Sequence, residues 1–348
     1  MKITDVKAFY PKWLYQPDKV WQKCFWQIVV RIDTDIGITG YGYGGGGEPG
    51  VLVINRHLRH HLVGVEVGSV NDIREIWDAL YFTSLPYGRT GIALMAISGI
   101  DLALLDLLGH AERKPVCDLI GVRTKERIRA YASCSNFGLA RDLGYNAVKF
   151  FHQWKGNSDY DKAVEMASNV RNLLPNALVM VDCYLSWDYV VTLEMSRRLA
   201  EFDVYWFEDV LSPDHLEEMA SLRLKIKPIL LAGGEHDFSP RTFQTIAKTG
   251  ALDLWQPDVT WCGGITAGLG IVNLAKSYNI PVILHRGGEV WGLHLIAGSN
   301  CMDLAETLLE HWTTPDKTLW LGEPRVENGT IYPLDLPGFG VRLNEDML

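Results

Sequence analysis

The chain has 348 residues, of which 47% are hydrophobic and 22% charged, and its formal net charge is −9 at pH 7. A globular chain of this length forms either two cores or one large barrel. The acidic balance argues against nucleic acid and anionic membrane surfaces as partners, because both select an excess of lysine and arginine. We therefore expect chemistry on a small molecule.

The cysteines and the N-terminus bear on the compartment. The cysteines lie far apart without a Cys-x-x-Cys pair, which predicts free thiols in a reducing cytosol. The start of the chain has no apolar signal-peptide core, and no segment approaches the roughly 18 apolar residues of a membrane span. We expect a soluble, cytoplasmic protein. The cysteines are Cys24, Cys117, Cys134, Cys183, Cys262 and Cys301.

The first third of the chain predicts a small α+β domain. Residues 27–44 alternate between apolar and polar and reverse at 34–37, as in an antiparallel hairpin. Helical patterns follow at 51–62 and 71–82. Residues 91–110 are apolar on nearly all sides, which predicts a helix buried all round.

From about residue 127 the pattern becomes strand, loop and helix, repeated in turn, which is typical of βα units in a parallel sheet. Eight such strands favour a closed barrel over an open sheet. The turn-rich tail is expected to pack back on the first domain. The predicted domains are a cap, 1–118 completed by 320–348, and a barrel, 119–319. The predicted strands are 127–133, 146–151, 177–183, 204–210, 228–235, 252–258, 281–287 and 303–309.

Polar side chains close most of the predicted barrel strands. In a parallel barrel the carboxyl ends of the strands meet at one mouth, where catalytic groups lie. From Asp182 onward the gaps are 26, 27, 23, 27 and 21 residues, close to one βα unit each. We therefore expect these side chains to gather around one mouth. They are Lys149, Asp182, Glu208, Glu235, Asp258, His285 and Glu306.

Asp182, Glu208 and Glu235 close three consecutive strands and offer three hard oxygen donors, which suit Mg²⁺ better than Zn²⁺. Without a cation, carboxylates this close would repel one another. A single strand-end carboxylate more often pairs with an arginine or lysine at the rim, but three in register favour a metal site. His236 and Asp237 follow directly and are candidates to lie beside the metal or the substrate.

Asp258 and His285 close neighbouring strands. A carboxylate on one ring nitrogen fixes the tautomer of the other and raises its basicity, as a general base requires. A lone histidine at a strand end is more often structural. The aspartate partner and the adjacent metal site favour catalysis.

These segments, "VDC", "FED", "GGEHD", "QPDVTWCGG", "LHRGG" and "AE", resemble the barrel of the enolase superfamily, mandelate racemase subgroup, and within it most the L-rhamnonate dehydratase group. The resemblance implies an α+β capping domain on a (β/α)7β modified TIM barrel and a homo-oligomer. It implies one Mg²⁺ on Asp182, Glu208 and Glu235. It also implies an Asp258–His285 dyad, with Glu306 hydrogen-bonding the substrate carboxylate.

The shared step of this superfamily is removal of a proton alpha to a carboxylate. Racemases of the subgroup carry Lys-x-Lys at the end of the second strand, whereas this chain has Lys149, Phe150 and Phe151. With His285 as the only evident base, we expect dehydration of a sugar acid to a 2-keto-3-deoxy acid. Lys149 is then a cation near the substrate carboxylate or the metal ligands, or a buried lysine paired to a strand-end acid.

Several alternatives stay open. After His285 the chain departs from the rhamnonate dehydratase pattern, with Arg286 and Glu289 where that group has small and polar residues, so L-lyxonate or L-mannonate would also fit. A racemase or epimerase and a non-catalytic scaffold are further alternatives. A metal-dependent amidohydrolase would need His-x-His on the first strand, and 127–134 has none.

The cap is expected to select the substrate through residues 10–23 and 41–50. The second segment is glycine-rich but lacks the lysine and the serine or threonine of a phosphate-binding loop, so we expect a flexible lid. His57, His60 and His61 invite a metal site, but a solvated basic helix face is the safer interpretation.

Overall fold

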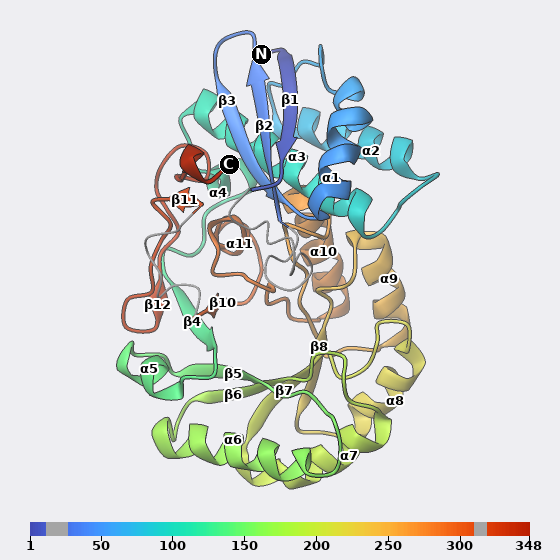
Figure 1. The fold of residues 1–348 in the computed structure, drawn as a ribbon, viewed down its shortest axis with the longest axis vertical. Helices are drawn as coiled ribbons and strands as arrows, with labels where there is room; N and C mark the ends of the chain where they lie inside the picture. The colour runs from blue at the N-terminus through green and yellow to red at the C-terminus, as the bar shows by residue number, and fades with distance from the viewer. Residues whose placement is uncertain (12–26, 310–318) are drawn as a thin grey trace.

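The computed structural model describes residues 1–11, 27–309 and 319–348 (Figure 1). Cys24 and most of the segment 10–23 lie outside these residues. The five other cysteines are free, as predicted, and all five are buried.

The cap begins with a three-stranded antiparallel sheet, in the order β1-β2-β3. The predicted hairpin is confirmed: β2 and β3 pair from Ile28–Gly44 to Asp33–Thr39. Gly37 allows the reversal with a φ of 79°, and its N–H donates to the Thr34 carbonyl over 3.2 Å. The strands are β1 (Ile3–Phe9), β2 (Ile28–Thr34) and β3 (Thr39–Gly44).

The cap helices lie where the periodicity predicts them (Figure 1). Every residue from Ala93 to Gly109 in α3 is buried. By length and composition this helix could cross a membrane, so the expectation that no segment approaches a membrane span was wrong. However, 94% of its most apolar stretch is buried inside the protein. The helices are α1 (Gly47–Arg56), the 3-10 turn η2 (Leu58–His61), α2 (Val70–Ser84) and α3 (Ile92–Glu112).

The prediction of a flexible lid at 41–50 was wrong. Residues 41–44 are part of β3, and Gly47–Gly50 form the first turn of α1. The glycines serve close packing: a Cβ on Gly42 would lie 2.1 Å from the Gly99 carbonyl oxygen of α3. Only a strand without side chains on that face can approach the helix backbone so closely.

The second part of the chain is the barrel. Its parallel strands run in the order β10-β4-β5-β6-β7-β8-β9. The predicted strand 281–287 is reduced to a bridge between Val282 and Trp255, and the Met302 N–H donates to the Val282 carbonyl over 2.9 Å. The strands are β4 (Ile128–Ser133), β5 (Ala147–Phe151), β6 (Leu178–Asp182), β7 (Val204–Glu208), β8 (Leu230–Gly233), β9 (Leu254–Trp255) and β10 (Leu304–Leu308).

The barrel interior is a hydrophobic cluster of its own, with one buried residue from each of the seven strands and one, Ile283, from the bridged segment. Eight staves therefore surround a packed centre, as the predicted fold class requires. Tyr131 and Trp206 are its largest members, and their ring centroids lie 5.7 Å apart in an edge-to-face arrangement. The members are Tyr131, Ala147, Met180, Trp206, Ala232, Leu254, Ile283 and Leu304.

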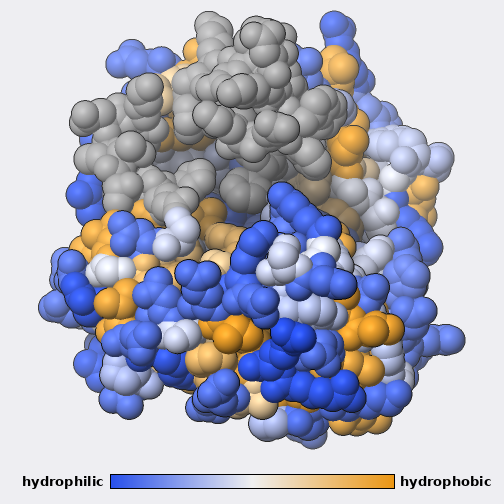
Figure 2. Space-filling model, turned by 60° about the horizontal axis from the view of Figure 1, so that its bottom comes forward, coloured by the Kyte–Doolittle hydropathy of each residue, from blue (hydrophilic) through white to orange (hydrophobic). Residues whose placement is uncertain are grey.

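Helices cover the outside of the barrel between its strands (Figure 1). The outer face at the bottom of that view is mostly polar, with apolar residues scattered among polar ones (Figure 2). The helices are α5 (Phe137–Asp142), α6 (Asp159–Leu173), α7 (Tyr189–Arg198), α8 (Leu216–Lys225), α9 (Ser239–Thr249), α10 (Gly264–Tyr278) and α11 (Val290–Ala297), with the 3-10 turn η3 (Ala200–Phe202).

The C-terminal segment contacts both parts of the chain. The Phe339 N–H donates to Asp106 of α3 over 3.0 Å, while β12 pairs with β4 of the barrel. The domain boundaries given above stay a prediction. The elements of this segment are β11 (Trp320–Leu321), β12 (Thr330–Ile331), β13 (Arg342–Leu343) and the 3-10 turn η5 (Glu345–Met347). The short helix α4 (Val116–Ile120) follows α3 and leads into the barrel.

Helix α3 of the cap holds the start of α10 of the barrel. Ser98 Oγ accepts from the N–H groups of Gly263 over 2.8 Å and Gly264 over 3.1 Å. Asp101 Oδ2 accepts from the Thr266 N–H over 3.0 Å. Three of the N–H groups at the start of α10, which a helix leaves unpaired, are thus satisfied across the two parts of the chain.

Candidate active site

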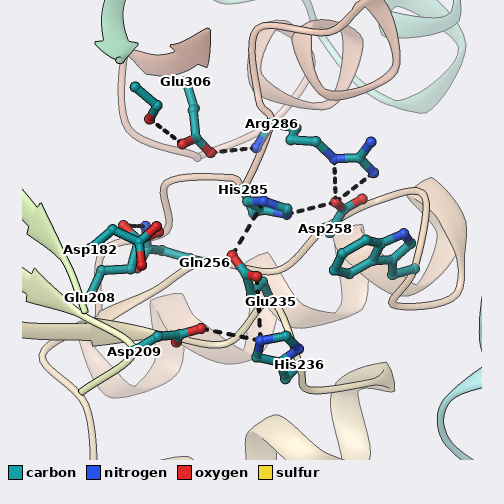
Figure 3. A network of polar contacts seen from close by, with 12 residues as sticks. Asp182, Glu208, Asp209, Glu235, His236, Gln256, Asp258, His285, Arg286 and Glu306 are labelled. Atoms are coloured by element: carbon teal, nitrogen blue, oxygen red, sulfur yellow. Dashed lines mark hydrogen bonds and ion pairs between the residues drawn. The ribbon is translucent and has the colours of Figure 1, made fainter. Parts of the chain in front are cut away.

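The structure brings all seven predicted strand-end residues to one mouth of the barrel. Parallel pairing places Asp182 beside Glu208 and Phe151 beside Asp182. Figure 3 shows Asp182 and Glu208 on one side, Asp258 on the other, and Glu235 with His285 between them.

Lys149 lies at the centre of the acidic side. It is 1% exposed, and its Nζ is 2.7 Å from Glu306 Oε1, 3.4 Å from Asp182 Oδ2 and in contact with Glu208 Oε1. Burial alone would lower the pKa of Lys149, but Glu208 and Glu306 raise it well above its usual value. Lys149 is therefore a buried cation, paired to strand-end acids.

Both oxygens of Glu208 are held. While Oε1 faces Lys149, Oε2 accepts from Trp206 Nε1 over 2.9 Å and from Gln256 Nε2 over 2.6 Å. Burial raises the pKa of Glu208 to about 8. Sequence reasoning missed Trp206 and Gln256. The signal for Trp206 was its position two residues before Glu208, on the same face of β7.

Glu235 joins the acidic side to the histidine. Its Oε2 is 3.3 Å from His285 Nε2, and its Oε1 is 3.4 Å from His236 Nε2. Gly234, with a φ of 124°, turns the chain directly after β8. His236 also lies 3.4 Å from Asp209 Oδ2, which sequence reasoning missed. Ligand atoms of Asp209, Glu235 and His236 all lie within 4.8 Å of one another.

Asp237, the other candidate of this segment, is buried in the following turn. Its N–H donates to the Gly234 carbonyl over 3.1 Å, and burial and then Asp214 raise its pKa to about 7. No side-chain hydrogen bond or ion pair joins it to the acidic cluster within the described ranges. Its proposed place beside metal or substrate stays a prediction.

The donor set at this mouth fits a hard divalent cation. Asp182, Glu208 and Glu235 contribute carboxylate oxygens from adjacent strands, and Asp209 adds another beside them. Burial raises the pKa of Asp182, and Glu235 adds to the shift by repulsion, while Lys149 opposes it. More negative charge therefore converges here than one lysine neutralises, which a cation of the Mg²⁺ class would balance.

His285 and Asp258 form a pair, as predicted. His285 Nδ1 is 2.8 Å from Asp258 Oδ2. Burial alone would lower the pKa of His285, but Glu235 and then Asp258 raise it to about 9. Burial would raise the pKa of Asp258, but Arg286 and His285 outweigh it and hold the pKa well below its usual range. The pair can hold or accept a proton at the imidazole.

Glu306 closes the opposite end of the site. Its Oε1 accepts from Ser133 Oγ and faces Lys149, and its Oε2 accepts from the Arg286 N–H over 2.7 Å. Burial would raise its pKa, but Lys149 and His285 lower it to about 2. Glu306 is thus ionised and accepts hydrogen bonds. Sequence reasoning missed Ser133, which ends β4 beside β10.

The three cap histidines lie elsewhere. His57 Nδ1 is 2.8 Å from the Tyr87 hydroxyl, and His61 Nε2 is 3.3 Å from Thr83 Oγ1, both in exposed positions. Among the described residues, the only cluster with metal-ligating spacing is the one that contains Glu235. A solvated face therefore remains the interpretation of these histidines.

A capped (β/α)7β barrel with an acidic cluster opposite a histidine–aspartate pair defines the class of enolase-type enzymes. Residues 137–347 match the family model described as "Enolase C-terminal domain-like". Residues 11–121 match "Mandelate racemase / muconate lactonizing enzyme, N-terminal domain". The chain belongs to the mandelate racemase and muconate lactonizing enzyme family of the enolase superfamily.

Relatives extend over the whole chain. It is 31% identical to an L-rhamnonate dehydratase of Saccharopolyspora erythraea, over 99% of this chain and 90% of the relative. It is similar to the crystal structure of rhamnonate dehydratase from Gibberella zeae complexed with Mg, with a TM-score of 0.89 and 27% identity over 99% and 95% of the two chains. A racemase from Streptomyces coelicolor with bound magnesium has a TM-score of 0.83 and 26% identity over 99% and 98%.

Proposed function

We propose that this protein is a Mg²⁺-dependent sugar acid dehydratase, a hydro-lyase that converts an aldonate to a 2-keto-3-deoxy acid. The observation that carries the proposal is the imidazole of His285, held between Asp258 and Glu235 at the mouth of the barrel. The 31% identical relative named L-rhamnonate dehydratase supports an L-rhamnonate-like substrate. L-Lyxonate and L-mannonate are the nearest alternatives.

Asp182, Glu208 and Glu235 would hold the Mg²⁺. When bound, the ion supplies positive charge against the negative charge that develops on the substrate carboxylate during proton removal. Trp206 and Gln256 fix the orientation of Glu208 by their bonds to its Oε2.

His285 takes the proton from C2 of the substrate, at its Nε2. In the neutral imidazole, the form that acts as the base, Asp258 accepts from Nδ1 and so keeps the unprotonated nitrogen at Nε2. After the step Asp258 stabilises the imidazolium. The same imidazolium then protonates the 3-hydroxyl, which leaves as water when the C3–O bond breaks. The enol that remains ketonises to the 2-keto-3-deoxy acid.

Lys149 and Glu306 would receive the substrate carboxylate. Because Glu306 is ionised, it has no proton to donate to another carboxylate. Lys149 is the donor at this end, and Glu306 fixes it over 2.7 Å. This refines the expectation that Glu306 hydrogen-bonds the substrate carboxylate: Glu306 would act there through Lys149.

The second strand argues against racemisation. Phe151, two residues after Lys149 and on the same face of β5, stands where a second base would be, and its ring centroid lies 6.0 Å from Lys149 Nζ. A phenyl ring cannot return a proton to the other face of C2. One base suffices for elimination, because a single imidazole can reach both the proton on C2 and the hydroxyl on C3.

The test is a screen of aldonates with Mg²⁺, in which 2-keto acid formation is measured, followed by His285→Asn. We expect His285→Asn to lose the activity by at least about 1,000-fold, because it removes both the base and the acid. His236→Asn is the matched control, since His236 also contacts Glu235 but is not assigned to proton transfer. Dehydration retained in a folded, Mg²⁺-binding His285→Asn variant would refute the assigned base. The proposed homo-oligomer is tested separately by light scattering.

A further inference from the structure

Arg286 follows His285 directly and has an unusual backbone conformation. Its φ is 49°, in the left-handed region that favours glycine, and the residue is only 4% exposed. A bulky residue is held in such a conformation only when its surroundings compensate. The contacts of Arg286 identify what compensates it.

The side chain of Arg286 grips the carboxylate of the dyad. Its Nε and Nη2 donate to Asp258 Oδ2 over 2.9 and 2.8 Å, and the same oxygen faces His285 Nδ1 (Figure 3). Nη2 also contacts Thr260 Oγ1, and Nη1 lies 3.3 Å from Glu289 Oε1. Two points of contact on one oxygen fix its position in a way that a single donor does not.

The backbone of Arg286 reaches the opposite side of the site. Its N–H donates to Glu306 Oε2 over 2.7 Å. The left-handed turn at this residue lets the N–H face Glu306 while the side chain faces Asp258. One residue thus joins both ends of the site.

A packed polar network supports the side chain. The guanidinium lies 5.2 Å from the ring centroid of Trp261, which lies 5.4 Å from the ring of His285. Trp261 Nε1 donates to Gln27 over 2.8 Å, and the N–H of Thr260 donates to Asp258 Oδ1 over 2.7 Å. The arrangement leaves Asp258 little freedom to rotate.

We propose that Arg286 is a positioning residue for the dehydration: it fixes the Asp258–His285 pair and Glu306 relative to each other. The inference rests on the proposed function. Arg286 acts through the imidazole of His285. The Nε2 of this ring must reach first C2 and then the 3-hydroxyl without a change in the orientation of the ring. The planar fork of a guanidinium gives this grip, and a lysine ammonium at the same place gives only one contact.

The variants are Arg286→Gly, which keeps the left-handed backbone, and Arg286→Lys, which keeps the charge. Because the fork acts on geometry during the reaction, we expect kcat to fall by about 30- to 100-fold for Arg286→Gly while KM changes less than about threefold. Guanidinium ion at a non-denaturing concentration should raise the kcat of Arg286→Gly at least about fivefold. Arg286→Lys should lose at least about tenfold.

Glu289→Gln is the matched control, because it removes the negative charge that faces Arg286 Nη1 but leaves the grip on Asp258. It should stay within about threefold of the unmodified protein. Three outcomes would overturn the proposal. The first is an effect confined to KM, and the second is a kcat of Arg286→Gly within threefold of the unmodified protein. The third is a loss of kcat that guanidinium does not restore. If Arg286→Gly does not fold, the kcat of Arg286→Lys decides in the same way.

A second measurement does not depend on activity. In protein with ¹⁵N-labelled histidine, the Nδ1–H of His285 should give a protected NMR resonance, assigned by its absence in His285→Asn. The Nδ1–H proton should exchange with water faster in Arg286→Gly than in the unmodified protein. Added guanidinium should slow this exchange again. Unchanged protection would overturn the proposal. Failure of the unmodified protein to dehydrate any aldonate would instead refute the proposed function, while the resonance still reports on Arg286.

Discussion

Asp101 makes the contact between the cap and the barrel sensitive to pH. It is 2% exposed, its Oδ2 accepts from the Thr266 N–H, and its Oδ1 has no partner among the described residues. Burial raises the pKa of Asp101 from its ordinary 3.8 to about 7. The folded protein therefore keeps a proton here that the unfolded chain releases at lower pH.

The sign and size follow from linkage. Below about pH 4 both states bind the proton, so the contribution to the free energy of unfolding is complete. As pH rises from 4 to 7 the unfolded state ionises first, and stability is lost until the pH passes the folded pKa. The loss between pH 5 and pH 7 is about 2 kcal/mol. For a chain of this size that is about 3 °C in Tm.

The perturbation is Asp101→Asn, which keeps the shape but does not titrate. Thermal unfolding should be measured at pH 5 and at pH 7. Between these two pH values the Tm of the unmodified protein should fall by about 3 °C relative to the Tm of the variant. Ser98→Ala is the control, because it removes neighbouring bonds to α10 without a titrating group and should lower Tm equally at both pH values. A difference between the Asp101→Asn and unmodified proteins that stays constant with pH would refute the reasoning, since Asp101 would then be ionised at the N-terminus of α10.

Three further predictions concern the site and the packing. Phe151→Lys should place a second base opposite His285, so ¹H NMR in D₂O should show epimerisation at C2, whereas Phe151→Met should not. Removal of divalent cations by a chelator should abolish dehydration, and added Mg²⁺ should restore it. Glu235→Gln should weaken Mg²⁺ binding at least about tenfold, as measured by calorimetry. An unchanged Mg²⁺ affinity would show that Glu235 is not a ligand. Gly42→Ala would place a Cβ 2.1 Å from the Gly99 carbonyl oxygen and should cost about 3 kcal/mol or more of stability; a Tm within 2 °C of the unmodified protein would contradict that packing.

The barrel could be predicted from the sequence because its information is local and repeated. Most of the apolar runs carry a polar side chain at or near their end, and the spacing of one βα unit implies parallel neighbours. The prediction erred where the same local pattern has two physical meanings. The run before His285 looks like the other strands, but it forms a bridge in place of a ladder. The glycines of 41–50 look mobile, but they permit contact with α3.

The contacts within the site were less accessible to sequence reasoning. Arg286 was noted only as a departure from a pattern, because nothing in the letters shows that its backbone is left-handed and its side chain returns to Asp258. Trp206 and Gln256 come from different strands and converge on one oxygen of Glu208. Such convergence depends on rotamers and strand register, which periodicity does not encode.

The sequence predicted the position of Lys149 at the mouth of the barrel but left its role open. Side chains two apart on a strand share a face, so Lys149 and Phe151 both belong to the mouth side of β5. Lys149 is surrounded by Asp182, Glu208 and Glu306, and a lysine ionised this firmly is a poor base. The same contacts that neutralise the acids thus withdraw Lys149 from proton transfer. Together with the phenyl ring beside it, this leaves proton transfer at C2 to His285.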